Sequence, residues 1–145
     1  MSEHDMRFEL LVDATPEEAF RQWNDAEARI SWHKVADHWI VEASTDLRVG
    51  GAWRVAFGPS TNEMSVEEGV YEFVDPPHRV VYTCVHRVAG RATFRTRVTV
   101  TFVASGDRTL VTLVDAGFPD DEMREEFEGG WPSFLAFFAR VVAAR

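Results

Sequence analysis

Asp115 is the residue whose position in this sequence best suits acid–base chemistry. It follows Val111 and Leu113 at alternate positions of an apolar run, which predicts a strand with all three side chains on one buried face. A carboxylate buried without a donor or a charge partner has a raised pKa, as a general acid or base requires. Tyr71 and Tyr82 are the hydroxyl groups that could share this work. In the other interpretation, Asp115 is hydrated at the open end of its strand or caps a loop.

Cys84 and His86 are a second candidate pair, because residues two apart on a strand lie on the same face. A nucleophilic cysteine needs a neighbour that lowers its pKa, and His86 is the residue that could do so. In the alternative, Cys84 is a buried thiol that packs as a small hydrophobic group. We favour this alternative.

His33 and His38 flank Lys34 and Asp37, but their spacing lacks the i, i+4 geometry of a helical pair of metal ligands. We interpret them as surface-loop histidines and assign no metal. The sequence has no glycine-rich phosphate loop and no nucleophile elbow, so we expect no cofactor.

Aromatic residues are numerous in the sequence, which has 5 Trp and 11 Phe. Small-molecule pockets are lined mainly by apolar and aromatic groups with a few polar anchors. Some of the residues that the pattern selects as cavity candidates will serve only as core. The candidates are Trp39, Trp53, Phe57, Tyr71, Phe73, Tyr82, Cys84, Phe94, Asp115, Trp131 and Phe134.

The elements that position these residues begin with an expected strand at Met6–Val12. A helix follows, with Thr15 as its N-cap, Pro16 at its first position and Glu18 three residues after the cap. A second short helix is expected at Asp25–Trp32.

Between Trp39 and Phe118 the hydrophobic period changes to two, which indicates consecutive antiparallel strands. The six strands that we expect are Trp39–Ala43, Gly51–Phe57, Val66–Val74, Arg79–Arg87, Phe94–Val103 and Thr109–Phe118.

After Phe118 the period is helical again, and the acidic run Asp120–Glu128 suits the positive end of a helix dipole. Pro132 predicts a kink in this helix or a restart near Trp131. The apolar stripe of the helix consists of Phe127, Trp131, Phe134, Phe138 and Val141.

These elements predict an α+β fold in which a curved antiparallel sheet of about seven strands wraps around a long C-terminal helix, with two short helices after the first strand. A strongly curved sheet needs points where the backbone can bend, and Gly50-Gly51 is such a point. We expect Gly69 to leave space opposite Trp53 and Phe57. The 145 residues fit one domain, 1–145.

Five segments carry a resemblance to a known family, in the order TPEEAFRQW, DLRVGGAWR, EEGVYEFVDPPHRVVYTC, TVTFVASGDRTLVTLVDAGF and GGWPSFLAFF. The sequence resembles the START-like (SRPBCC) superfamily and, within it, the activator of heat-shock protein 90 ATPase homologue family. This resemblance implies a helix-grip fold that holds a hydrophobic small molecule between the sheet and the C-terminal helix. The sequence departs from the usual family pattern at Cys84, Asp115 and Pro132, so the identity of the ligand does not follow.

Charge and composition exclude several classes of partner. The net charge of -9 opposes binding to nucleic acid or to an anionic membrane surface. No stretch approaches the ~20 apolar residues that span a bilayer. The single Cys84 and the absence of a signal-peptide pattern predict a cytoplasmic protein. A homodimer stays possible.

Three functions follow as hypotheses. The first is a non-enzymatic, or at most weakly catalytic, protein that binds a lipid-, aromatic- or polyketide-like molecule in a cavity between the sheet and the last helix. The second is a cyclase-, aromatase- or hydrolase-like enzyme that uses Asp115 with Tyr71 or Tyr82. The third, which the family resemblance suggests, is a chaperone-cofactor module that binds another protein.

Overall fold

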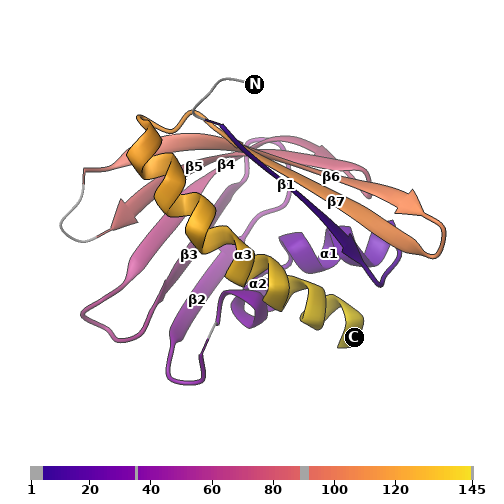
Figure 1. Ribbon diagram of the computed structural model, residues 1–145, viewed down its shortest axis with the longest axis horizontal. Coiled ribbons are helices and arrows are strands. Elements are labelled where there is room, and N and C mark those ends of the chain that lie inside the picture. Colours follow the sequence, from indigo (N-terminus) through magenta and orange to yellow (C-terminus); the bar gives the residue numbers. More distant parts are fainter. Residues whose placement is uncertain (1–4, 35, 89–91, 145) are drawn as a thin grey trace.

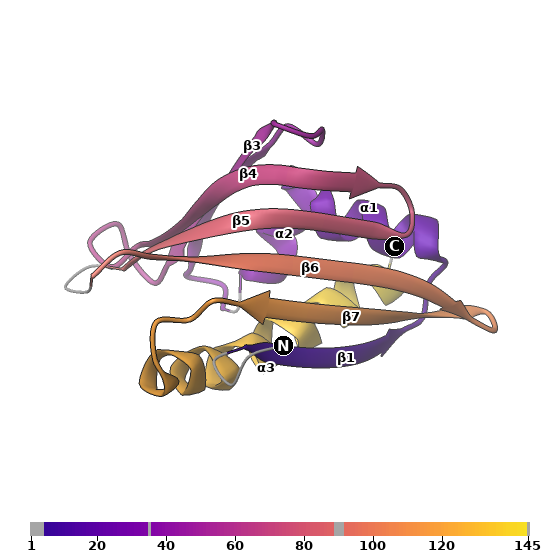
Figure 2. The ribbon, with the colours of Figure 1, turned by 90° about the horizontal axis from the view of Figure 1, so that it is seen from above.

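A curved sheet of seven antiparallel strands holds the helices on its concave side (Figure 1). The computed structural model describes residues 5–34, 36–88 and 92–144. Seen from above, β3, β4, β5, β6, β7 and β1 lie side by side, with α1 and α2 behind them (Figure 2). The predicted α+β helix-grip architecture is confirmed.

The strands pair in the order β1-β7-β6-β5-β4-β3-β2, so β1 and β2 form the two edges. Every expected strand is present, β1 has the predicted bounds, and the ends of the other strands differ from the prediction by at most two residues. The bounds are β1 Met6–Val12, β2 Ile40–Thr45, β3 Ala52–Gly58, β4 Ser65–Asp75, β5 Arg79–Val88, β6 Phe94–Ser105 and β7 Arg108–Ala116.

The two short helices begin at side-chain caps, of which the cap of the first was predicted from the sequence. Helix α1 (Pro16–Asn24) starts after Thr15, whose hydroxyl accepts a hydrogen bond from the Glu18 backbone N–H at 3.2 Å. Helix α2 (Ala26–His33) starts after Asp25, whose carboxylate accepts from the Ala28 N–H at 3.2 Å. These caps fix where the chain leaves β1 and turns across the concave face.

Helix α3 (Asp121–Ala144) runs through Pro132 as one helix and does not restart at Trp131. Proline removes one backbone N–H donor, which leaves a carbonyl on the preceding turn without its usual partner. Pro132 is exposed, so water can hydrogen-bond to that carbonyl. The buried side of the helix, with Leu135, Phe138 and Val142, packs against the core.

Glycine allows the sheet to bend at the β2–β3 connection. Gly50 has a φ of +85°, in the left-handed region that other residues avoid. A Cβ on Gly51 would lie 2.0 Å from the Asp46 carbonyl oxygen. The prediction that this pair turns the chain from one strand into the next is confirmed.

Gly69 on β4 has a different role from the expected one. It pairs with Trp53 in register, but a Cβ at this position would lie 1.8 Å from the Thr83 carbonyl oxygen of β5. That same carbonyl accepts a hydrogen bond from the Trp53 indole N–H at 3.0 Å. Gly69 therefore provides room for the backbone of β5, and not for a ligand.

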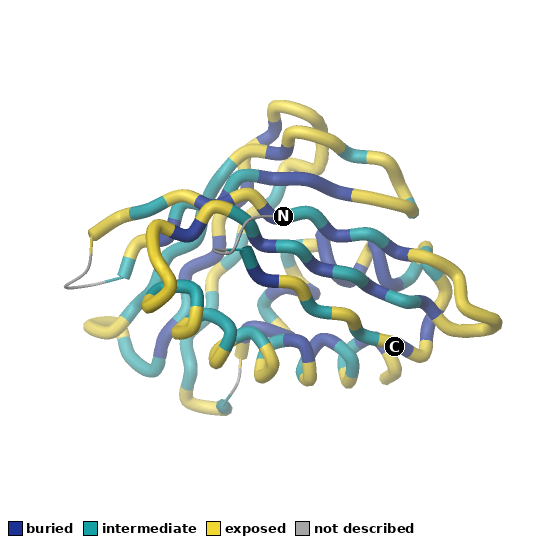
Figure 3. Tube along the Cα trace, turned by 45° about the horizontal axis from the view of Figure 1, so that its top comes forward, coloured by how far each residue is buried: buried dark blue, intermediate teal, exposed yellow. Residues whose placement is uncertain are grey.

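Alternate strand residues fill the concave side, as the period-two pattern predicts. On β6, Val98, Val100 and Phe102 are buried, and the residues between them are exposed or half-buried (Figure 3). The core continues under α1, α2 and the C-terminal half of α3, where Phe138 is fully buried. Among the described residues, none of the helices is both long enough and apolar enough to cross a membrane.

Candidate functional site

A cavity of about 230 Å³ separates the sheet from the N-terminal half of α3. The helix side of this cavity consists of Met123, Glu126, Phe127, Gly130, Trp131 and Phe134. The sheet side includes Phe57, Val66, Glu67, His86, Val88 and Phe94. The concave face is thus filled by side chains beneath one half of α3 and left hollow beneath the other half.

Rings from three elements close one side of the cavity. His86 on β5 stacks on Phe94 at the start of β6, with their centroids 4.6 Å apart. Phe127 of α3 meets His86 edge-on at 4.8 Å and Phe94 at 5.6 Å. Such edge-to-face pairs stabilise beyond the area that they bury, so this wall is a preformed aromatic surface.

His33, at the C-terminal end of α2, lies on the opposite wall. Its ring is 5.3 Å from Phe57 and 5.1 Å from Phe134, and its Nδ1 donates to the Arg29 carbonyl oxygen at 2.9 Å. The interpretation of His33 as a surface-loop residue is wrong, because the ring is buried at 3% exposure. Burial and the nearby Arg29 guanidinium lower the pKa of His33 to about 4, so the imidazole is neutral at pH 7.

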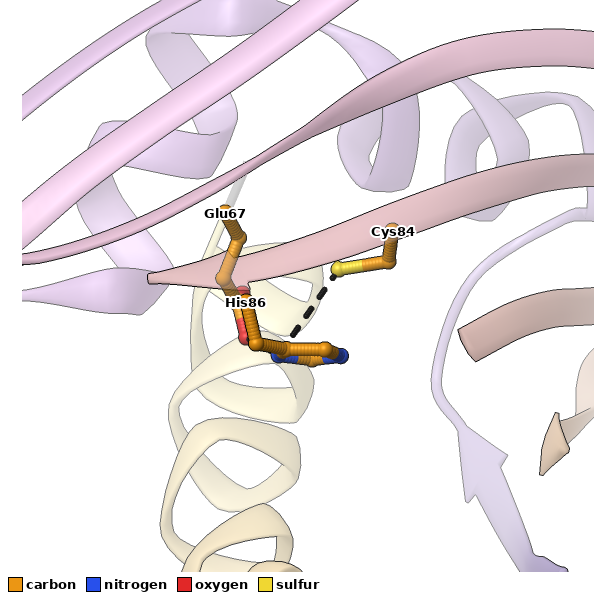
Figure 4. Close-up of side chains that lie close together, drawn as sticks. All are labelled: Glu67, Cys84 and His86. Carbon is orange, nitrogen blue, oxygen red and sulfur yellow. Dashed lines mark hydrogen bonds and ion pairs between the residues drawn. The ribbon is translucent and has the colours of Figure 1, made fainter. Parts of the chain in front are cut away.

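Three polar side chains converge at the base of the cavity (Figure 4). His86 Nδ1 lies 3.1 Å from a Glu67 carboxylate oxygen and 3.9 Å from Cys84 Sγ. The other ring nitrogen, Nε2, lies 2.9 Å from the Thr96 hydroxyl. Glu67 and His86 line the cavity, whereas Cys84 and Thr96 lie behind them.

Burial acts differently on the two acidic members of this group. Burial works to raise the pKa of Glu67, but the hydrogen bond and attraction of His86, together with the attraction of His33 and Arg29, outweigh burial and hold that pKa below its ordinary value. Burial raises the pKa of the Cys84 thiol well above its ordinary value, so the thiol is protonated at pH 7. The preferred interpretation of Cys84 as an unreactive thiol agrees with this environment.

Asp115 is fully buried on the concave face, as the alternation of its strand predicts. Trp131 of α3 covers it and donates its indole N–H to Oδ2 at 3.3 Å. Burial raises the pKa of Asp115 to about 6, although hydrogen bonds from Thr96 and Trp131 work against that shift. Asp115 Oδ1 is buried and has no hydrogen-bond partner in the part of the chain that the structure describes. Asp115 does not line the cavity, because Trp131 lies between them.

Tyr71 and Tyr82 lie in the solid part of the core, around the buried side chain of Arg29. The Arg29 guanidinium lies 4.8 Å from the ring of Trp53 and 5.3 Å from that of Tyr82, in cation–π contact. The Tyr82 hydroxyl accepts a hydrogen bond from the Trp23 indole N–H at 3.1 Å. Burial raises the pKa of Tyr82 to about 12, so it does not act as an acid or base near neutral pH.

The structure does not bring Asp115 to either tyrosine. Val98 of β6 pairs with Tyr82 on one side and with Asp115 on the other. Two strand spacings therefore separate their backbones, which is about 10 Å. Tyr71, on β4, is one strand farther away.

The remaining predicted cavity residues lie in different surroundings. Phe57, Phe94, Trp131 and Phe134 line the cavity. Trp39 is half-buried and stacks on Phe57 at 6.3 Å. Phe73 follows an irregularity in the pairing of β4 with β5, is 42% exposed and stacks under Arg79, away from the cavity. Phe73 was predicted to line the cavity because of simple alternation along β4, and the irregularity between Tyr71 and Phe73 breaks that alternation.

Sequence reasoning missed several residues of the site. Glu67 has the same parity on β4 as Tyr71, and Thr96 has the same parity on β6 as Val98, so alternation could have placed both on the concave face. Arg29 has no such signal. Its burial depends on aromatic rings contributed by distant strands.

Comparison with known proteins identifies related chains. The family model described as "Activator of Hsp90 ATPase homolog 1-like protein" matches residues 13–143. Among curated proteins no match was found.

Several solved structures have the same fold. Protein CV1439 from Chromobacterium violaceum has 24% sequence identity and a TM-score of 0.85, and the alignment covers 98% of this chain and 99% of that one. Protein MLL2253 from Mesorhizobium loti has 18% identity and a TM-score of 0.78, with coverage of 95% and 96%. DynU16, described as a protein in the dynemicin biosynthetic locus, has 18% identity and a TM-score of 0.76, with coverage of 96% and 47%. At these identities the likeness shows the fold alone.

Proposed function

The chain belongs to the Activator of Hsp90 ATPase homolog 1-like family, and we propose that it binds a compact aromatic molecule in the cavity beneath the N-terminal half of α3. The observation that carries this proposal is the hollow itself. The same helix buries Leu135, Phe138 and Val142 against the core farther along, so it can fill the concave face where that is required.

The walls of the cavity favour a flat, apolar ligand. Phe94 and Phe127 present ring faces and edges on one side, and Phe57 and Phe134 do so on the other. Aromatic rings prefer offset-stacked or edge-to-face contacts, and an aromatic ligand can make both with these walls. A saturated hydrocarbon ligand would bury apolar surface in the cavity, but it could not make these ring-to-ring contacts.

The size of the cavity favours a small ligand. Pockets for drug-sized molecules usually enclose roughly 300–1,000 Å³. The volume of about 230 Å³ lies below that range, so the ligand has one or two rings, not a polycyclic skeleton.

Glu67 supplies a polar anchor at the base. A carboxylate accepts several hydrogen bonds, so Glu67 can bond to His86 and also accept one from a ligand hydroxyl. A phenol combines this donor with a ring of suitable size. The likeness in fold to DynU16, from a biosynthetic locus, is compatible with such a ligand.

The proposal can be tested by filling the mouth of the cavity from α3. Gly130 lines the cavity, the adjacent Gly129 does not, and a Cβ added at either position meets nothing within 4 Å. Replacing either glycine by leucine improves helix propensity by up to about 1 kcal/mol. We expect Gly130→Leu to weaken binding of small phenols at least 10-fold, as measured by calorimetry or ligand-observed NMR, and Gly129→Leu to leave it unchanged.

A saturating ligand at 100 times its Kd should also raise the stability of the wild-type protein by about 2.7 kcal/mol. All titrations are made with a metal chelator present. A library of phenols and other one- and two-ring aromatic compounds that produces neither binding nor stabilisation contradicts the proposal. Equal binding by the two leucine variants would place the ligand elsewhere.

The arrangement does not favour the alternative in which Asp115 and a tyrosine form an acid–base pair. Asp115 has a suitable pKa of about 6, but Trp131 separates it from the cavity and both tyrosines lie on distant strands. Binding without chemistry is the simpler function for these residues.

A further inference from the structure

Glu67, Cys84 and His86 bring three different metal-ligating atoms together. One potential ligand atom from each lies within 4.8 Å of the other two. Cys84 and His86 are two apart on β5 and face the same way, and Glu67 pairs with His86 in register on β4 (Figure 4). The rigid, hydrogen-bonded centre of the sheet therefore holds all three.

The geometry does not fit a nucleophilic triad. In such a triad, one ring nitrogen of the histidine contacts the nucleophile and the other contacts the carboxylate. Here both the thiol and the carboxylate approach Nδ1 of His86, at 3.9 Å and 3.1 Å, and Nε2 is occupied by Thr96 at 2.9 Å. The thiol and the carboxylate therefore share one nitrogen of His86 and do not lie at opposite ends of its ring.

The separations suit ligands around one zinc ion. Tetrahedral Zn²⁺ with bonds of about 2.0–2.3 Å places a sulfur and a nitrogen ligand roughly 3.6 Å apart, and a nitrogen and an oxygen ligand roughly 3.3 Å apart. The separations here of 3.9 Å and 3.1 Å lie within a few tenths of an ångström of these values. We propose that Glu67, Cys84 and His86 form a binding site for one Zn²⁺ ion.

The donor set selects zinc among the common divalent cations. Thiolate and imidazole are ligands for Zn²⁺, whereas Mg²⁺ and Ca²⁺ prefer oxygen ligands alone. Binding displaces the thiol proton to solvent, and the thiolate and the carboxylate then neutralise the two charges of the ion. A buried ion is thus compensated without any further charged residue.

The surroundings resemble those of a zinc ion with one open position. Ligating histidines usually donate their second N–H to an outer partner, and the Thr96 hydroxyl lies in that place on His86. Asp115 lies close enough to Thr96 for the two groups to interact, and so it extends this outer layer. Glu67 and His86 line the cavity, so the fourth coordination position faces it and is open to water or to a ligand hydroxyl.

The test uses the full chain after removal of metal with a chelator and involves no organic ligand, so its outcome is independent of the proposed aromatic ligand. Zn²⁺ is titrated by calorimetry, and Co²⁺ is titrated as a spectroscopic substitute. We expect one equivalent of each metal to bind, and a sulfur-to-cobalt charge-transfer band to appear in the near-ultraviolet.

The variants are Cys84→Ser and Glu67→Gln, both nearly isosteric, with His38→Ala as a control because exposed His38 lies outside the cluster. Cys84→Ser should abolish the charge-transfer band and weaken Zn²⁺ binding at least 100-fold. Glu67→Gln should weaken binding at least 10-fold, and Thr96→Val 10–100-fold by loosening His86. His38→Ala should bind as the wild type does. The proposal is overturned if the wild type binds no stoichiometric metal, if cobalt binds without a sulfur band, or if Cys84→Ser binds zinc as tightly as the wild type.

Discussion

The two ends of the concave face bury ionisable groups in opposite ways. We define the packed end by Trp23, Arg29, Trp53, Tyr71 and Tyr82. There, aromatic rings surround the Arg29 guanidinium, and none of these five side chains lines the cavity. Burial works to lower the pKa of Arg29, but the tyrosines and Glu67 outweigh it, so the group stays charged. The aromatic faces and the Trp23 carbonyl oxygen, which accepts from Arg29 Nε at 3.1 Å, take the place of water around that charge.

We define the hollow end by Glu67, Cys84, His86, Phe94 and Asp115. There, Glu67 and His86 line the cavity, and Cys84 and Asp115 lie outside its lining. The carboxyl of Asp115 is shifted toward its neutral form, whereas Glu67 keeps its charge through His86. We infer from this difference that packing at the packed end supplies stability, and that this stability allows the hollow end to retain polar groups and a cavity. Strained or incompletely satisfied groups are tolerated when the rest of the fold compensates for them.

The largest expected effect is loss of packing at the packed end. Trp53→Ala removes a side chain that is 2% exposed, its hydrogen bond to Thr83 and one face around Arg29. We expect the free energy of unfolding, measured in urea, to fall by about 3–5 kcal/mol. Phe94→Ala at the hollow end should cost only roughly 1–2 kcal/mol, because Phe94 is half-buried beside the cavity. Equal losses would show that the two ends do not differ in packing.

The next effect concerns His33, between the two ends. Its folded-state pKa of about 4 lies below its ordinary value of 6.5, so the unfolded chain binds more protons between these values. The stability that this adds is present above pH 6.5 and is lost as pH falls toward 4, by about 3 kcal/mol. In His33→Asn, where the amide nitrogen can replace Nδ1 as donor to Arg29, unfolding at a series of pH values should lack this loss. If His33→Asn has the same pH profile of unfolding as the wild type, the loss of stability at low pH does not come from His33.

Asp115 should show a smaller effect of opposite sign. Its folded-state pKa of about 6 lies above its ordinary value of 3.8, so the folded chain binds more protons between these values. The stability from the neutral acid is present below pH 3.8 and is lost as pH rises through 6, by roughly 3 kcal/mol at most. Asp115→Asn should therefore become more stable relative to the wild type from pH 4 to pH 7 in chelator-containing buffer. A constant difference between the two proteins across this range would show that the carboxyl does not titrate there.

The pH profiles of unfolding of the His33 and Asp115 variants can be compared with that of the wild type. Because His33 and Asp115 change stability in opposite directions over overlapping pH ranges, the wild-type profile should be flatter than that of either variant. At the packed end, Tyr82 has a pKa of about 12, so Tyr82→Phe should leave the shape of the profile between pH 4 and pH 7 unchanged.

Local patterns in the sequence predict most of the fold. Thr15, Pro16 and Glu18 locate the start of α1, and period-two alternation locates the strands, because caps and alternation depend on residues close in sequence. The same alternation places Asp115 on the buried face. It does not reveal that Phe73 leaves the concave face, because the pairing irregularity before it involves β5 as well as β4.

The sequence by itself determined the curved sheet, the long last helix and the side of the sheet that most strand residues face, because the period of hydrophobic residues encodes those features locally. Only the tertiary structure decided that Glu67 meets Cys84 and His86, that Arg29 lies among aromatic rings and that Trp131 covers Asp115. These contacts depend on strand register and on the position of α3 over the sheet. Register and helix position are set by packing among residues distant in sequence, which local periodicity does not contain.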